Sequence, residues 1–153
     1  MANHRWLVDT NILLRMVQSD SLDNPAILAC LDLLWQRGAE FFYTAQNLAE
    51  FWNACTRPRD KNGFGNSIEL TDRYATQIEA RLSFAPDSES THREWRKIVL
   101  AQRVSGVQVH DARLVAAMHV HEIGNLLTLN VADFRRYGDI LAATPTEVLA
   151  QSD

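Results

Sequence analysis

Acidic side chains beside predicted strands and helix starts are the first candidates for chemistry in this sequence. Asp9 comes directly after the apolar run Trp6-Leu7-Val8. Asp111 stands at the start of a predicted helix, and Asp133 follows a strand at the start of a helical turn. A fourth carboxylate, Glu50, falls among apolar residues of a predicted helix, where a charge needs a partner. Because ligands bind beyond the carboxyl edge of a parallel sheet, we expect these four carboxylates to lie together there.

Such a cluster predicts a metal site. Carboxylates held close together repel one another and shift each other's pKa, and a bound divalent cation is the usual resolution. Oxygen ligands alone favour Mg²⁺ or Mn²⁺ over zinc. The histidines show no zinc-ligand spacing, and we interpret all five as non-ligands: His4, His92, His110, His119 and His121. The two cysteines, Cys30 and Cys55, lie in apolar helical patterns and are expected to be reduced core thiols.

Each acidic residue also has a purely structural interpretation. Asp9 could bond only to turn amides and favour the start of the next helix. Asp111 could cap its own helix, and Asn130 with Asp133 three residues later resembles a reciprocal cap. Glu50 could lie at the edge of its apolar stripe and reach solvent. The sequence alone leaves these alternatives open.

The elements that position these residues alternate along the chain. Short apolar runs predict strands at 6–8, 40–43 and 126–129, a short one within 83–86, and a weak one at 139–143. Helical patterns cover 12–17, 24–38, 44–57, 71–82, 88–104, 111–123 and the tail from 146. Strands separated by helices imply right-handed crossovers and a mainly parallel sheet. We therefore predict an α/β fold.

Length and charge narrow the class of protein. A chain of 153 residues is about one ordinary domain, so residues 1–153 are expected to form a single one. No apolar run reaches a membrane span, and no signal-peptide pattern follows the N-terminus, so we expect a cytoplasmic protein. A net charge of −4 argues against a protein that holds nucleic acid by charge alone. The long loop over 57–67 is either a substrate lip or a solvated connection.

The sequence also resembles the PIN-domain ribonucleases, and among them the VapC-type toxins of bacterial toxin-antitoxin pairs. Four motifs stand in the family's order and cover nearly the whole chain. They are Leu7-Val8-Asp9-Thr10-Asn11, Ala49-Glu50-Phe51, His110-Asp111-Ala112-Arg113-Leu114-Val115-Ala116 and Leu127-Thr128-Leu129-Asn130-Val131-Ala132-Asp133-Phe134. The resemblance implies a PIN-like nuclease domain, with a mainly parallel sheet of four or five strands flanked by helices on both sides.

The resemblance also implies roles for particular residues. Asp9 and Asp111 would be the principal ligands of Mg²⁺ or Mn²⁺, and Glu50 and Asp133 would complete the catalytic cluster, directly or through water. Asn11, Thr128 and Asn130 would orient it. Asn130 stands where some members carry Asp, so the fourth acidic role falls on Asp133. Homodimerisation and inhibition by a cognate antitoxin protein would follow from the same likeness.

The chemistry implied is hydrolysis of RNA phosphodiester bonds, in which metal ions lower the pKa of bound water and stabilise developing charge. Glu50 could position or deprotonate that water. Because an acidic pocket repels RNA, nearby cations must meet the phosphates; by position these are Arg57, Arg59, Lys61, Arg135 and Arg136.

Two other classes of protein remain as alternatives. A phosphatase with an Asp nucleophile would need a second Asp where Asn11 stands, and Asn11 argues against it. A non-catalytic PIN-like binding module with a vestigial acidic site is the other. Metal-dependent cleavage of RNA separates both from the nuclease.

Overall fold

The sheet is the centre of the fold. The computed structural model describes residues 3–151, and within them five strands form one sheet in the order β3-β2-β1-β4-β5. The strands are β1 (Arg5–Val8), β2 (Glu40–Tyr43), β3 (Ser83–Phe84), β4 (Asn125–Leu127) and β5 (Leu141–Ala143). Every neighbouring pair is parallel. The α/β fold with a five-stranded parallel sheet, predicted from the alternation of strands and helices, is confirmed.

Helices connect the strands. They are α1 (Thr10–Val17), α2 (Asn24–Gln36), α3 (Ala45–Thr56), α4 (Ile68–Arg81), α5 (Glu89–Ala101), α6 (Gln108–Val120) and α7 (Pro145–Ala150), with 3-10 turns η1 (Arg59–Lys61) and η2 (Val131–Phe134). Capping boxes begin α3 at Thr44, α5 at Ser88 and α7 at Thr144, where a side chain accepts from an otherwise unpaired amide.

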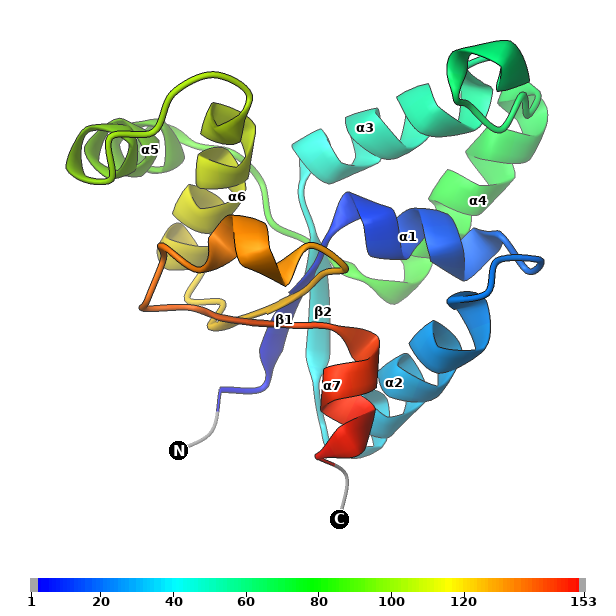
Figure 1. Cartoon of the computed structure of the whole chain (residues 1–153), viewed down its shortest axis with the longest axis horizontal. Coiled ribbons are helices and arrows are strands. Elements are labelled where there is room, and N and C mark those ends of the chain that lie inside the picture. The colour runs from blue at the N-terminus through cyan, green and yellow to red at the C-terminus, as the bar shows by residue number, and fades with distance from the viewer. Residues whose placement is uncertain (1–2, 152–153) are drawn as a thin grey trace.

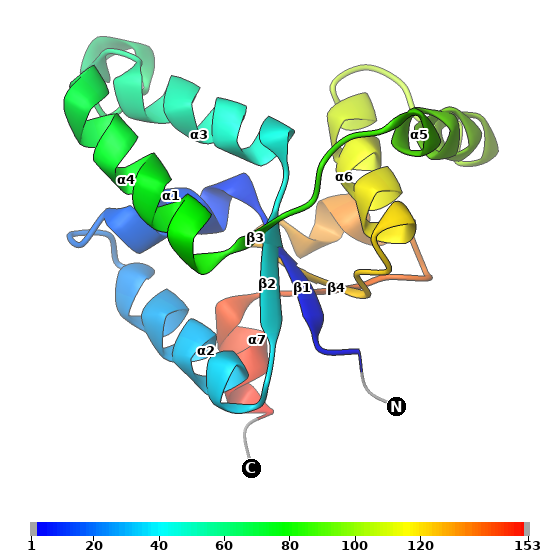
Figure 2. The same ribbon diagram turned by 180° about the vertical axis from the view of Figure 1, so that it is seen from behind.

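Two hydrophobic clusters cover the two faces of the sheet. Because successive side chains of a strand point to opposite faces, Trp6 and Val8 join one cluster while Leu7 joins the other. The first cluster packs against α1, α2, α3, α4 and α7, and the second against α5 and α6. Figures 1 and 2 show these two groups of helices on opposite sides of the strands. The predicted helices on both faces are therefore confirmed.

Some predicted boundaries are wrong. Helix α4 begins at Ile68 rather than at residue 71, because the Ser67 side chain accepts from Leu70 N and caps it. Helix α5 ends at Ala101 rather than at residue 104, and Arg103 beyond it adopts a left-handed φ of 52°. The apolar periodicity therefore did not mark these two helix ends. The Ser67 side chain caps the start of α4, and the left-handed backbone at Arg103 follows the end of α5.

The loop after α3 folds back onto that helix. The amides of Phe64 and Gly65 donate to the carbonyls of Ala54 and Arg57, at 3.0 and 2.9 Å. A Cβ at Gly63 would lie 1.9 Å from the Arg57 carbonyl oxygen, so only glycine allows this close approach. The segment is an ordered connection that adds a rim beyond the end of α3.

Two further predictions concern the core and the membrane. Cys30 and Cys55 are both free and buried, as expected, and burial raises the pKa of each thiol to about 11. Over residues 3–151 no helix has both the length and the apolar character that crossing a bilayer would require.

Candidate active site

Asp9 lies where β1 gives way to α1, at the carboxyl edge of the sheet. It is the N-cap of α1, and its Oδ1 accepts from Thr10 N at 2.8 Å. Its Oδ2 accepts from the Thr128 hydroxyl, also at 2.8 Å, and the residue is only 8% exposed. The structural interpretation of Asp9 as a turn-bonding cap is thus correct for one oxygen. The other oxygen connects the end of β1 to the segment that follows β4.

Thr128 is the centre of the polar contacts around Asp9. While its hydroxyl donates to Asp9, it accepts from Asn11 Nδ2 at 3.4 Å and from the Asn130 amide at 3.0 Å. Asn11 Oδ1 also accepts from Leu129 N at 3.2 Å. The structure therefore brings Asn11, Thr128 and Asn130 together beside Asp9, and Asn130 takes part through its backbone.

Glu50 reaches the same region from α3. Its Oε2 accepts from the Thr10 hydroxyl at 2.9 Å, and its Oε1 accepts from Gln46 Nε2 at 3.0 Å. Asn47, fully buried, donates from Nδ2 to the Thr10 hydroxyl at 3.2 Å. The side chain of Glu50 is exposed, as one alternative held, yet both of its oxygens are bonded. Gln46 also donates to the His110 carbonyl at 3.0 Å and so joins α3 to α6.

Asp111 lies within the first turn of α6, which begins at Gln108. The N-cap of that helix is Val107, and no side chain caps it. The alternative that Asp111 caps its helix is therefore wrong. The reciprocal cap of Asn130 and Asp133 is also wrong, because η2 has no side-chain cap bond. Asp133 instead lies exposed on that turn.

Charge–charge interactions connect Asp9 and Asp111 with the other acidic residues of the site. Burial raises the pKa of Asp111 to about 6, with further contributions from the negative charges of Asp9, Asp133 and Glu50. Burial also raises the pKa of Asp9, against the bonds from Thr128 and Thr10 and together with the charges of Glu50 and Asp133. Asp9 and Asp111 therefore lie within electrostatic reach of each other, and both lie within reach of Glu50 and Asp133.

The donor set fits a hard divalent cation in type and in charge. All four side chains offer oxygen, and their mutual repulsion would be relieved by a bound cation. Among residues 3–151, however, no three acidic, histidine or cysteine side chains already converge closely enough to ligate one ion. Glu50 and Asp133 are the exposed members of the set, and both oxygens of Glu50 are already bonded.

Three of the five basic residues proposed from the sequence, Arg57, Arg59 and Arg136, bond to oxygen atoms of the chain itself. Arg57 Nη2 donates to the Asn62 carbonyl at 2.9 Å, and Arg59 Nε donates to the Phe64 carbonyl at 3.3 Å. Arg136 donates to Gln108 Oε1 at 2.8 Å, at the start of α6. These contacts brace the loop after α3 and the turn after η2.

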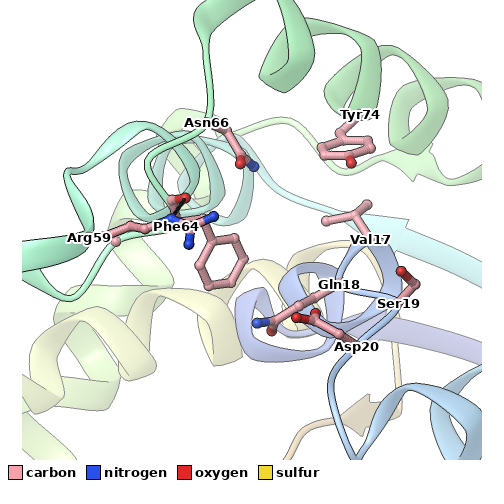
Figure 3. Close-up of a pocket in the computed structure, with 9 residues that line it drawn as sticks. Val17, Gln18, Ser19, Asp20, Arg59, Phe64, Asn66 and Tyr74 are labelled. Carbon is pink, nitrogen blue, oxygen red and sulfur yellow. Dashed lines mark hydrogen bonds between the residues drawn. The ribbon is translucent and has the colours of Figure 1, made fainter.

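A hollow of about 690 Å³ lies where the loop after α3 faces the end of α1. Phe64 and Arg59 line it from the loop, Tyr74 from α4, and Gln18 and Asp20 from the segment after α1. Figure 3 shows Phe64 pointing across the hollow toward Gln18. The hollow begins at the far end of α1 from Asp9, so it is separate from the carboxylates.

Sequence reasoning missed the residues that hold Glu50. Thr10 belongs to the first of the four motifs, but the sequence assigns neither it nor Gln46 or Asn47 a contact with Glu50. The one available signal was Thr44-Ala45-Gln46-Asn47, a capping pattern that places Asn47 inside the first turn of α3. Nothing in that pattern shows that the amide of Asn47 reaches Thr10.

Comparison with known proteins gives a structural likeness only. No protein-family model and no curated protein matches the sequence. A chain of VapBC2 from Rickettsia felis, solved bound to a DNA fragment from its promoter, matches with a TM-score of 0.68 and 15% identity over 92% of this chain and 98% of that one. VapBC-1 from nontypeable Haemophilus influenzae matches with a TM-score of 0.63 and 16% identity over 93% and 98%.

A third structure carries a functional description. VapC20 from Mycobacterium tuberculosis, a Sarcin-Ricin loop cleaving toxin, matches with a TM-score of 0.54 and 17% identity over 79% of this chain and 86% of that one. Together with the parallel sheet and its order, these likenesses establish that the chain has the PIN-domain fold of VapC-type structures. The fold expected from the four sequence motifs is confirmed.

Proposed function

We propose that this protein is a Mg²⁺- or Mn²⁺-dependent endoribonuclease and the toxin of a toxin-antitoxin pair. The observation that carries the proposal is the gathering of Asp9, Glu50, Asp111 and Asp133 at one edge of the sheet, where burial and mutual repulsion raise the pKa of Asp9 and Asp111. The structural likeness to VapBC proteins and to a Sarcin-Ricin loop cleaving toxin supports the same assignment.

The proposed roles follow from the contacts of each carboxylate. Asp9 and Asp111 would be the principal metal ligands, with Glu50 and Asp133 completing the set. A bound ion would lower the pKa of water and stabilise charge on the phosphate. The Thr128 hydroxyl fixes one oxygen of Asp9, and Asn11 in turn donates to Thr128.

Glu50 is the candidate for positioning or deprotonating the attacking water. The Thr10 hydroxyl donates a hydrogen bond to one of its oxygens and the Gln46 amide donates one to the other, which limits its rotation. The carboxylate remains exposed while both of its oxygens are bonded. Its remaining lone pairs are the ones available to water.

Substrate and partners are part of the same proposal. We propose that the RNA backbone is met by the cations identified from the sequence. Arg135 and Arg136 lie within three residues of Asp133, whereas Arg57, Arg59 and Lys61 belong to the loop after α3, where Arg59 lines the hollow at the far end of α1. Because the similar structures include VapBC proteins, we propose a cognate antitoxin protein as partner. Homodimerisation and a cytoplasmic location complete the proposal.

The test is cleavage of a panel of labelled RNAs by the purified protein with Mg²⁺, Mn²⁺ or EDTA. Asp9→Asn and Asp111→Asn keep the shape of each side chain and remove its charge. The proposal predicts cleavage that needs metal and is abolished by either substitution, with circular dichroism unchanged. A folded wild-type protein that leaves every RNA intact would instead favour the non-catalytic binding module with a vestigial acidic site.

A further inference from the structure

A second hollow lies beside the acidic edge and is lined by aromatic side chains. It has a volume of about 420 Å³, and its lining includes Tyr43, Leu48, Trp52, Glu79 and Phe84. We call it the aromatic hollow. Phe84 is 50% exposed although it is a large apolar residue, and its ring packs on that of Tyr43 with centroids 5.2 Å apart. One face of Phe84 is thus supported by the protein while much of the ring meets solvent.

The sheet fixes how far this hollow lies from the carboxylates. Tyr43 ends β2 and is paired in register with Phe84, which ends β3. Strand β1 lies on the other side of β2 and leads directly into Asp9. Since adjacent strands lie about 4.8 Å apart, the backbone of Phe84 is roughly 10 Å from that of Asp9 along the same edge. Figure 2 shows β3 beside β2, between α4 and the segment leading to α5.

Helix α3 connects the two places. Ala45 and Ala49 also line the aromatic hollow, whereas Gln46 and Glu50, the residues after each of them, bond toward Thr10 and His110 at the acidic edge. Both alanines are exposed and carry no more than a methyl group. At these two positions, no side chain larger than a methyl group stands between the aromatic hollow and the carboxylates.

The lining combines a stacking surface with one acceptor group. Phe84 and the partly buried Trp52 provide aromatic faces, on which unpaired bases stack with little regard to sequence. Glu79 adds an exposed carboxylate, close enough to Tyr43 that its charge contributes, after burial, to raising the pKa of the Tyr43 hydroxyl. An ionised carboxylate only accepts hydrogen bonds, so it selects ligands with adjacent N–H donors.

We propose that the aromatic hollow binds one unpaired guanine of the RNA substrate next to the cleaved phosphate, with Phe84 and Trp52 stacking the base and Glu79 accepting from its N1–H and N2–H groups. The inference rests on the proposed ribonuclease function and adds a base preference to it. Guanine alone presents two adjacent N–H donors on its pairing edge. Adenine, cytosine and uracil each bring an acceptor nitrogen or oxygen toward the carboxylate, and that contact is repulsive.

The experiment maps cleavage sites in a randomised single-stranded RNA with Mn²⁺ by sequencing the products of the full-length protein. The wild type is expected to cut with guanine enriched at one fixed position near the cleaved bond. Glu79→Gln is expected to remove that enrichment with overall cleavage retained. Phe84→Ala is expected to raise KM for short RNAs by about 10-fold, because the loss of one base stack weakens binding by about that factor.

Matched controls separate these effects from general damage. Glu69→Gln, also an exposed carboxylate of α4, and Trp35→Ala, an aromatic that is 65% exposed on α2, are expected to leave the cleavage pattern and KM unchanged. Circular dichroism and thermal unfolding confirm that each variant is folded.

The outcomes distinguish this inference from the function on which it rests. If the wild type cuts RNA but Glu79→Gln and Phe84→Ala cut the same positions with the same KM, the aromatic hollow is not a base site although the ribonuclease stands. If the wild type cuts no RNA, both fail. If sedimentation shows that Phe84→Ala converts a dimer to a monomer while the base preference persists, the hollow is an interface between two copies and the proposal is overturned.

Discussion

The hydroxyl of Thr128 donates to the carboxylate of Asp9 across a separation of 119 residues, at 2.8 Å in a buried position. This bond joins the loop after β4 to the start of α1. The same hydroxyl accepts hydrogen bonds from the Asn11 amide and from the Asn130 backbone, so its one donor and two acceptor sites are all used. One hydroxyl thus sets the orientation of the most buried acidic residue of the candidate site.

Thr128→Val should therefore both destabilise the protein and impair the site. Valine keeps the shape of threonine, but it leaves Asp9 short of a donor and the Asn130 amide short of an acceptor. We expect a loss of about 1–3 kcal/mol in the free energy of unfolding, measured by urea denaturation. Thr128→Ser keeps the hydroxyl and is the matched control. Equal stability of the valine variant and the wild type would contradict the account of this bond.

The buried amide of Asn47 supports a second prediction. Its Oδ1 accepts from both the backbone and the hydroxyl of Thr44, and its Nδ2 donates to Thr10, which holds Glu50. Asn47→Ala should cost about 2 kcal/mol in the free energy of unfolding, because it leaves buried donors without partners. It should also lower RNA cleavage by the folded protein, since Thr10 loses its support.

Asn53→Ala, an exposed position two turns further along α3, is the control for Asn47. Its unfolding free energy should stay within about 0.5 kcal/mol of the wild type. The account of Glu50 fails if Asn47→Ala unfolds at a lower urea concentration than the wild type but, while folded, cleaves RNA as fast.

The raised pKa of Asp111 predicts a pH dependence of stability without metal. Burial and the neighbouring carboxylates move this pKa from 3.8 to about 6, so between these values the folded state binds more protons than the unfolded state. Stability contributed by this group is therefore present at low pH and is lost as the pH rises through about 6. In EDTA, Asp111→Asn should gain stability over the wild type between pH 4 and pH 7, by about 1 kcal/mol after allowance for solvent screening.

Chemical unfolding of both proteins at a series of pH values measures this difference directly. Asp32→Asn, which changes an exposed carboxylate on α2, is the control and should show no such trend. A difference between Asp111→Asn and the wild type that stays constant from pH 4 to pH 7 would mean that Asp111 titrates as an ordinary surface carboxylate.

The two cysteines give a prediction about the core. Since burial raises the pKa of Cys30 and Cys55 to about 11, neither thiol forms thiolate at neutral pH. In the folded protein at pH 8, both should react with a thiol reagent at least 10-fold more slowly than in urea. Rapid modification of one thiol in the folded protein would mean that its helix opens readily to solvent.

Much of the fold was predictable because its signals are local. The run Trp6-Leu7-Val8 marks a buried strand, and the strand leads straight into Asp9 and α1. The start of α4 was not predictable in the same way. Ser67 lies at the end of a polar, glycine-containing loop. Only the folded structure shows that its hydroxyl accepts a hydrogen bond from the Leu70 amide.

The candidate site was likewise predictable only in part. A parallel sheet has to bring Asp9 and the end of β4 to one edge, so their proximity follows from strand order. The contacts from Thr10 to Glu50 and from Asn47 to Thr10 join residues 40 and 37 positions apart. Those contacts depend on side-chain rotamers set by packing of α1 against α3, which no short sequence pattern contains.

The central claim is that the four carboxylates act together as a divalent metal site, and Mn²⁺ binding followed by electron paramagnetic resonance tests it most directly. The wild type should bind Mn²⁺ and reduce the signal of the free ion, while Asp9→Asn and Asp111→Asn should each weaken binding by 10-fold or more, about 1.4 kcal/mol. Asp32→Asn should bind as the wild type does. If the wild type and the two site variants bind Mn²⁺ equally, or the wild type not at all, the acidic edge is not a metal site.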